Sequence, residues 1–269
     1  MIRYSANINM AFREYPFYER FQRAAALGFA AVEFASPFTY DVEEIVRAVK
    51  KASVRVVQFN VLDGDVAAGE RGFASHADRR EQWRAEMLRG IEFGRRLGVR
   101  QVNSLAGRVI PGLDRQAQLE CLVDNCRWAV PHLEKAGFPM LLEALNPYDN
   151  PGYLLTRSRD VLDVLERVGS PWVKFQCDVY HMQRVEGELV RTIRANIAQI
   201  GHIQIADNPG RHQPGTGEIN YRFVLQAIDE AGYTGYVGLE YIPLGSTEES
   251  FNWLPFDKRV ESTAADLKL

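Results

Sequence analysis

Residues 136–178 read AGFPMLLEALNPYDNPGYLLTRSRDVLDVLERVGSPWVKFQCD, and this stretch contains one complete strand–helix–strand unit. The apolar runs Met140–Glu143 and Val173–Asp178 have the length and bulk of buried strands. Between them, Arg157–Val168 has the apolar spacing of an amphipathic helix and is followed by Gly169. Glycine just past a helix adopts the left-handed conformation that ends it. The stretch therefore predicts two parallel strands joined by a helix.

The same alternation of strands and helices extends along the whole chain. Further helices are predicted at Pro16–Leu27, Asp41–Ala52, Arg79–Leu97, Asp114–Ala136, Gly187–Ile200 and Tyr221–Ala231. Further strands are predicted at Tyr4–Asn7, Ala31–Phe34, Arg55–Asn60, Arg100–Ser104, His202–Ala206 and Tyr236–Tyr241. Eight evenly spaced strands in 269 residues favour closure into a (β/α)8 barrel, which needs ~250 residues. We predict an α/β fold, a single-domain TIM barrel over residues 1–269, with a short helix and a tail after Tyr241 that packs on the barrel or extends from it.

Composition and charge argue against several classes of protein. The formal net charge is −3, which disfavours a nucleic-acid partner. No apolar run approaches the ~18 residues of a membrane span. The three cysteines, Cys121, Cys126 and Cys177, form no C-x-x-C pair, and no apolar leader opens the chain. We therefore expect a cytoplasmic protein with a small-molecule substrate and no membrane or nucleic-acid partner, and formation of a homo-oligomer is left open.

Side chains that bind hard cations end four of the predicted strands. Glu143, Asp178, Gln204 and Glu240 each follow a short apolar run. A carboxylate at the end of a buried strand costs free energy unless it is paired or bound to a cation. In TIM barrels the active site lies at these strand ends, so the four residues are expected to converge. Oxygen ligands favour Mg²⁺ or Mn²⁺ over Zn²⁺. The alternative for each residue alone is a carboxylate that caps a helix or pairs with an arginine.

Three further side chains are candidates for contact with substrate. His181 lies three residues after Asp178, in the predicted loop, where a neutral imidazole can donate to a substrate oxygen or orient a ligand. Arg71 lies in the long connection from about residue 61 to 77, and Arg211 lies in the loop after the Gln204 strand. Either guanidinium can bind a carboxylate in bidentate fashion. The alternatives are a packing histidine and two solvated arginines.

Several motifs together resemble the hydroxypyruvate isomerase family, within the xylose-isomerase-like barrels. They are Ser5-Ala6-Asn7, Gly69-Glu70-Arg71-Gly72, Asp178-Val179-Tyr180-His181-Met182-Gln183, residues 201–207, residues 214–221 and Gly238-Leu239-Glu240-Tyr241. The resemblance implies a divalent metal at Glu143, Asp178, Gln204 and Glu240, with Glu143 and Glu240 as the proton-transfer pair. From these motifs we also expect Asn7 and Glu70 to contact substrate.

Two departures from the family pattern bear on the substrate. This chain has Ala144-Leu145 where relatives often carry a proline, and Asn60-Val61-Leu62-Asp63 where many have Asn-Leu-Pro. The second departure lies in the long connection that we expect to act as a lid.

The resemblance implies interconversion of an α-hydroxy ketone and an α-hydroxy aldehyde through an enediolate. We expect hydroxypyruvate to be converted to tartronate semialdehyde, or a 2-oxotetronate analogue to react in the same way. The first alternative is a ketose 3-epimerase acting on an uncharged sugar, although such enzymes usually carry a histidine where Gln204 stands. More remote alternatives are an endonuclease of the same superfamily, which needs a histidine-rich zinc cluster, and a binding protein without catalysis, which would lack one of the two glutamates.

Overall fold

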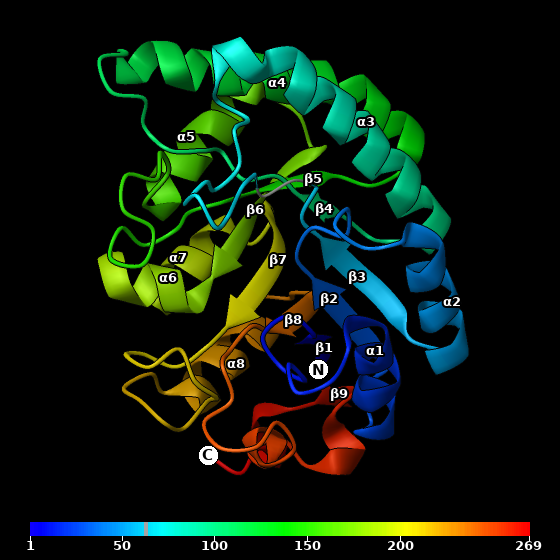
Figure 1. The fold of residues 1–269 in the computed structure, drawn as a ribbon. Helices are drawn as coiled ribbons and strands as arrows, with labels where there is room; N and C mark the ends of the chain where they lie inside the picture. The colour runs from blue at the N-terminus through cyan, green and yellow to red at the C-terminus, as the bar shows by residue number, and fades with distance from the viewer. Residues whose placement is uncertain (62–63) are drawn as a thin grey trace.

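Eight strands form one parallel sheet that curls into a barrel, as the sequence predicts (Figure 1). The computed structural model describes residues 1–61 and 64–269. The strands are β1 Ile2–Asn7, β2 Ala31–Phe34, β3 Arg55–Phe59, β4 Val102–Asn103, β5 Met140–Glu143, β6 Val173–Asp178, β7 Ile200–Ile205 and β8 Tyr236–Leu239. Their order is β3-β2-β1-β8-β7-β6-β5-β4. The backbone N–H of Val61 donates to the carbonyl of Asn103 at 2.8 Å, which brings the two ends of the sheet together.

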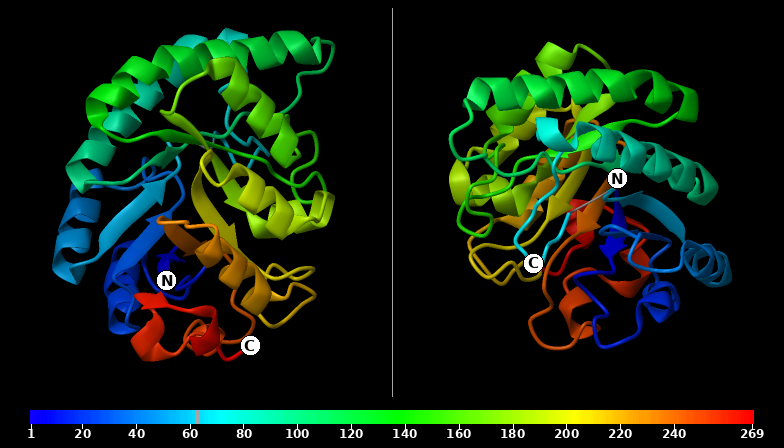
Figure 2. Two further views of the ribbon diagram at one scale, coloured as in Figure 1. Left: turned by 180° about the vertical axis from the view of Figure 1, so that it is seen from behind. Right: turned by 45° about the horizontal axis from the view of Figure 1, so that its top comes forward.

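Helices cover the outside of the barrel, as both views in Figure 2 show. They are α1 Phe17–Ala26, α2 Val42–Ala52, α3 Arg80–Leu97, α4 Arg115–Ala136, α5 Ser158–Val168, α6 Val179–Val185, α7 Leu189–Asn196 and α8 Tyr221–Glu230. Gly169 ends α5 with φ of 68°, which confirms the predicted left-handed end, and Gly98 and Gly137 end α3 and α4 in the same way with φ of 65° and 81°. Side chains such as Phe21, Ile45 and Leu225 are fully buried against the sheet, and each such burial contributes ~1.5–3 kcal/mol.

Polar side chains face the interior of the barrel. Along β6, Gln176 and Asp178 point inward while Phe175 and Cys177 point toward the helices, because successive side chains of a strand alternate. Glu33 of β2 hydrogen-bonds His202 of β7, although β1 and β8 lie between these strands in the sheet. The two residues therefore meet across the interior. The sheet thus gathers its polar groups on the inside and its apolar groups under the helices.

The structure corrects one predicted loop and several element boundaries, since β4 and β8 are also shorter than predicted. Residues Val179–Val185 form the helix α6 directly after β6, where a loop was predicted. Asp178 starts this helix by accepting a hydrogen bond from the backbone N–H of Tyr180 at 2.9 Å, which is the usual role of aspartate at a helix N-cap. The predicted helix 187–200 is the shorter α7, and β7 already begins at Ile200.

The C-terminal segment packs on the barrel but contains no α-helix in residues 242–269, all of which are described. It forms 3-10 turns at Glu249–Phe251, Phe256–Lys258 and Ala264–Asp266, since Pro243, Gly245 and Pro255 interrupt any longer helix. The short strand β9 Glu261–Ser262 pairs antiparallel with β1. Among the helices of residues 1–61 and 64–269, none is long and apolar enough to cross a membrane.

Candidate active site

The four predicted cation-binding residues all lie at the carboxyl ends of neighbouring strands. Glu143 and Asp178 end β5 and β6, Gln204 is the next-to-last residue of β7, and Glu240 directly follows β8. The strand register sets Asp178 beside Gln204, and Gln204 beside Gly238, two residues before Glu240. The expected placement at one end of the barrel is therefore observed.

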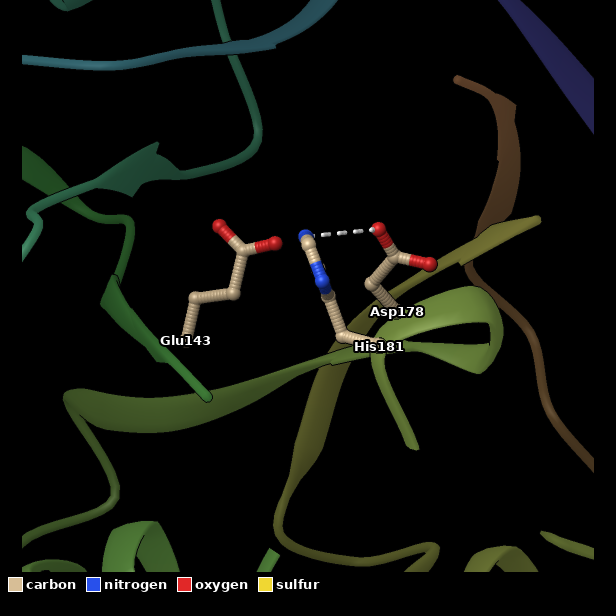
Figure 3. A group of neighbouring side chains, drawn as sticks. All are labelled: Glu143, Asp178 and His181. Atoms are coloured by element: carbon tan, nitrogen blue, oxygen red, sulfur yellow. Dashed lines mark ion pairs between the residues drawn. The ribbon is translucent and has the colours of Figure 1, made fainter. Parts of the chain in front are cut away.

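Glu143, Asp178 and His181 point toward one another (Figure 3). One ligand atom of each lies within 4.8 Å of the others, and all three residues are buried. His181 comes from the first turns of α6, and its Nε2 lies 3.5 Å from Oδ2 of Asp178. The helix that the sequence did not predict thus carries His181 to the carboxylates.

Arg211 links Glu240 to this group. Its Nη2 donates to Oε2 of Glu240 at 2.7 Å and lies 3.5 Å from Oδ2 of Asp178. The guanidinium also lies over the ring of Tyr180, with 5.2 Å between the guanidinium carbon and the ring centroid. The neighbouring charges of Glu240, Asp178 and Glu143 raise the pKa of Arg211 above its ordinary value even though burial opposes this. Arg211 is thus charged and lies at the predicted site.

The three carboxyl groups are buried, and burial raises the pKa of each one despite the nearby guanidinium of Arg211. Burial, followed by the charges of Glu240 and Asp178, raises the pKa of Glu143 well above its ordinary value. Burial also raises the pKa of Asp178, against the opposing effect of Arg211. Burial, with the charge of Asp178 adding to it against Arg211, raises the pKa of Glu240 to about 8. Converging carboxylates with raised pKa values are a donor set that a hard divalent cation would stabilise.

The amide side chains of Asn7, Asn103 and Gln176 hydrogen-bond the glutamates of this site. The side-chain amide of Asn7 donates to Oε1 of Glu240 and to Oε1 of Glu33, both at 3.3 Å. Asn103 donates to Oε2 of Glu143 at 3.0 Å, and Nε2 of Gln176 donates to the same oxygen at 2.9 Å. The predicted substrate residue Asn7 therefore contacts a proposed catalytic glutamate.

Glu33 is a buried carboxylate that our sequence reasoning missed. It accepts hydrogen bonds from Nε2 of His202 at 2.8 Å and from Nε2 of Gln204 at 2.7 Å. Although burial opposes it, the charge of His202 and hydrogen bonds from His202, Gln204 and Ser5 hold the pKa of Glu33 below its ordinary value. Glu33 lies near the end of the short apolar strand β2, which is the same sequence signal that the other four residues show. His202 is fully buried on β7 and hydrogen-bonds Glu33 from within the barrel.

The carboxylate of Glu33 restricts the residue type at position 238 and orients the side chain of Gln204. A Cβ at Gly238 would lie 2.4 Å from Oε2 of Glu33, so only glycine leaves room for that carboxylate. Because Nε2 of Gln204 is bound to Glu33, its oxygen faces the other way and accepts from Nε2 of Gln176 at 2.7 Å. A carbonyl oxygen has a second lone pair, so Gln204 can still bind a cation.

Glu70 and Arg71 lie in the loops after β3 and contact each other and their neighbours. Nε of Arg71 donates to Oδ1 of Asn150 at 2.8 Å, and its Nη1 donates to the carbonyl of Glu70 at 2.7 Å. The Glu70 carboxylate is bound to Arg79 and to the backbone N–H of Asp65. In the described part of the chain, neither side chain hydrogen-bonds the three carboxylates. Leu62 and Asp63, part of the expected lid, lie outside the described residues.

A family model described as xylose isomerase-like TIM barrel matches residues 21–255 of the chain. The hydroxypyruvate isomerase of Escherichia coli strain K12 is 42% identical over 254 residues, which covers 94% of this chain and 98% of that protein. The 2-oxo-tetronate isomerase of Haemophilus influenzae is 37% identical over 253 residues, with 94% and 98% coverage.

Solved structures agree on the fold. The structure named AP endonuclease, family 2, from Brucella melitensis superimposes with a TM-score of 0.91 at 38% identity, covering 94% of this chain and 98% of that one. A 3-keto-D-glucoside 4-epimerase from E. coli superimposes with a TM-score of 0.79 at 21% identity, with 94% and 98% coverage. The second likeness is one of fold alone.

Proposed function

This chain belongs to the xylose isomerase-like TIM barrel family, and on that premise we propose that it is an isomerase of a small sugar acid. The substrate would be hydroxypyruvate, converted to tartronate semialdehyde, or a 2-oxo-tetronate that reacts in the same way. Two relatives with these activities in their names are similar over 94% of the chain. The observation that carries the proposal is the convergence of Glu143, Asp178 and Glu240 around Arg211 at one end of the barrel.

Glu143 and Glu240 are the proposed proton-transfer pair. Isomerisation requires removal of a carbon-bound proton beside a carbonyl and its return to the neighbouring carbon, through an enediolate. A carboxyl whose pKa is raised toward neutrality can take up and release a proton under ordinary conditions. In the cation-free protein, burial raises the pKa of both residues, to about 8 for Glu240. Asn103 and Gln176 orient Glu143 through Oε2, and Arg211 orients Glu240.

The proposed cation ligands are Glu143, Asp178, Gln204 and Glu240. The donor set is three carboxylates and one amide oxygen, which suits Mg²⁺ or Mn²⁺. When bound, such a cation supplies Lewis-acid polarisation of the substrate carbonyl and offsets negative charge. The raised pKa values of the three carboxyl groups support the proposal, since burial makes their ionised forms costly and a bound cation would offset that cost.

His181, Arg211 and Arg71 are proposed to bind the substrate, with Asn7 and Glu70 beside them. Burial, then the charges of Arg211 and Arg184, lowers the pKa of His181 well below its ordinary value, so the imidazole is neutral. A neutral imidazole can donate one hydrogen bond to a substrate oxygen. In the described part of the chain, Nη1 of Arg211 and Nη2 of Arg71 make no hydrogen bonds, and each can donate to a substrate carboxylate.

The proposal is tested with a panel of substrates. The purified chain is treated with a chelator, resupplied with Mg²⁺ or Mn²⁺, and offered hydroxypyruvate, a 2-oxo-tetronate and uncharged ketoses, with products identified by NMR. Isomerisation of a keto acid that depends on the added cation is the expected result. Turnover confined to uncharged ketoses would replace the proposal with 3-epimerisation.

An abasic-site DNA duplex belongs in the same panel, because one similar structure carries the name of an endonuclease. The net charge of −3 and the single histidine among the three converging residues argue against cleavage. Cleavage that exceeds keto-acid turnover would overturn the isomerase proposal.

A further inference from the structure

Both donors of one asparagine point at a single nitrogen of His181. The backbone N–H of Asn146 donates to Nδ1 of His181 at 3.2 Å. Its side-chain Nδ2 lies 2.7 Å from the same nitrogen. Asn146 and His181 are buried, so water does not compete for these contacts. A ring nitrogen that faces two N–H groups has to be the unprotonated acceptor.

The amide of Asn146 cannot reverse this arrangement. Its Oδ1 accepts from the backbone N–H groups of Tyr148 at 3.1 Å and Asp149 at 3.0 Å. Its Nδ2 also donates to Oδ2 of Asp149 at 2.9 Å. A flipped amide would set an oxygen against the Asp149 carboxylate and an NH₂ against two backbone N–H groups. The turn that follows β5 thus fixes which end of the amide faces His181.

The Asp149 carboxylate also accepts hydrogen bonds from two side chains of α6. The hydroxyl of Tyr180 donates to its Oδ2 at 2.8 Å, and Nη1 of Arg184 donates to its Oδ1 at 3.2 Å. Tyr180 and Arg184 both belong to α6, the helix that carries His181. The same helix therefore presents the imidazole and anchors the turn that controls it.

We propose that Asn146 is a positioning residue that keeps the proton of His181 on Nε2, where it faces Glu143 and Asp178. The neutral ring has one proton and one lone pair. With the lone pair of Nδ1 bound by Asn146, Nε2 carries the proton and is a donor. Its role toward a substrate oxygen rests on the proposed function, but the position of the proton does not.

The tautomer is read from ¹⁵N chemical shifts of the histidine side chains in the full chain, with and without Mg²⁺. The His181→Asn variant assigns the His181 signals. In the wild type, we expect a protonated Nε2 and an unprotonated Nδ1. Asn146→Asp keeps the acceptor for Tyr148 and Asp149 but turns an oxygen toward Nδ1, so Nδ1 should become protonated. A wild-type protein with a proton on Nδ1, or an N146D protein without one, would overturn the proposal.

Two further variants separate positioning from general damage. Asp149→Asn is the matched exchange three residues away, and it should leave the His181 shifts as in the wild type, because two backbone N–H groups still hold Oδ1 of Asn146. Asn146→Ala keeps only the longer backbone contact of 3.2 Å, so the population of the Nε2-protonated tautomer should fall and the shifts should move toward those of the other tautomer. Unchanged shifts in N146A would show that the side chain does not control the ring, and this result stands even if N146D does not fold.

Activity tests the role toward substrate separately. With cation content matched to the wild type, N146D should lose at least ~10-fold in kcat/KM, the effect of losing about one hydrogen bond to the substrate. A shifted proton with unchanged kcat/KM would leave the positioning of His181 intact and count against its proposed contact with substrate.

Discussion

Nη2 of Arg211 donates to Oε2 of Glu240 at 2.7 Å. Arg211 is the arginine proposed to bind the substrate carboxylate, and Glu240 is one of the two proposed proton-transfer residues. The two residues are 29 positions apart and lie after β7 and β8. The contact offsets part of the charge that burial makes costly for Glu240. If Arg211 binds the substrate as proposed, we expect binding of an anionic substrate to be coupled to the protonation of Glu240 through this guanidinium.

Arg211→Lys should weaken binding of a keto acid far more than binding of an uncharged ketose. Lysine keeps the charge but loses the planar fork, so one ion-paired hydrogen bond, ~1.5–3 kcal/mol, is lost. The expected result is a rise of at least ~10-fold in KM for the keto acid. Arg194→Lys, on the exposed pair with Glu230, is the control and should change neither KM. Equal effects of Arg211→Lys on both substrates would count against a role in carboxylate recognition.

Replacing either proposed proton-transfer residue should slow turnover without removing the cation. Glu143→Gln and Glu240→Gln keep the shape and an oxygen ligand but lose the ionisable group. Each variant should lose at least ~10²-fold in kcat, the lower range for general acid–base catalysis. The variant that lacks the abstracting base should also exchange the substrate's carbon-bound proton with deuterated solvent more slowly. Cation content is measured alongside, and a fully loaded variant with normal turnover would reduce that glutamate to a ligand.

The cation-free protein should lose stability as pH rises from about 4.5 toward about 8. Burial raises the pKa of Glu240 from its ordinary 4.5 to about 8 in the folded state. Between these values the folded chain holds a proton that the unfolded chain has released, so the free energy of unfolding falls with pH. Urea denaturation of the cation-free, chelator-treated protein at several pH values measures the slope of the free energy of unfolding against pH. The slope should be shallower in Glu240→Gln, and an identical slope would contradict the raised pKa.

Glu33→Ala should destabilise the fold strongly, although Glu33 lies behind the proposed ligands. The change leaves the donors of His202 and Gln204 without their buried acceptor, and breaking a buried pair in this way costs ~3–5 kcal/mol. Glu92→Ala, on an exposed pair with Arg95, is the control and should change the free energy of unfolding by less than ~0.5 kcal/mol. Urea denaturation compares the two, and a similar small loss for both would refute the structural role of Glu33.

Local features of the chain predicted much of the fold and the position of the site. Apolar runs predicted all eight parallel strands, and glycines predicted where several of the preceding helices end, because strand length and helix ends depend on neighbouring residues. The four proposed ligands lie at strand ends for the same reason, since the end of an apolar run is visible in the sequence. The sequence does not reveal the helix α6 although Asp178 is a good N-cap, because its seven residues make only about two turns, too few to show a clear apolar period.

Only the tertiary structure decided which polar groups meet and in which protonation state. Glu33 and His202 are 169 positions apart and come together because the sheet curls back across its own interior. The orientation of His181 depends on a turn 35 positions earlier, and the raised pKa values of the carboxyl groups depend on burial among charges from several strands. Periodicity in a sequence reports the face on which a side chain lies. Hydrogen bonding and desolvation act over a few ångströms between residues that the closed barrel alone brings together.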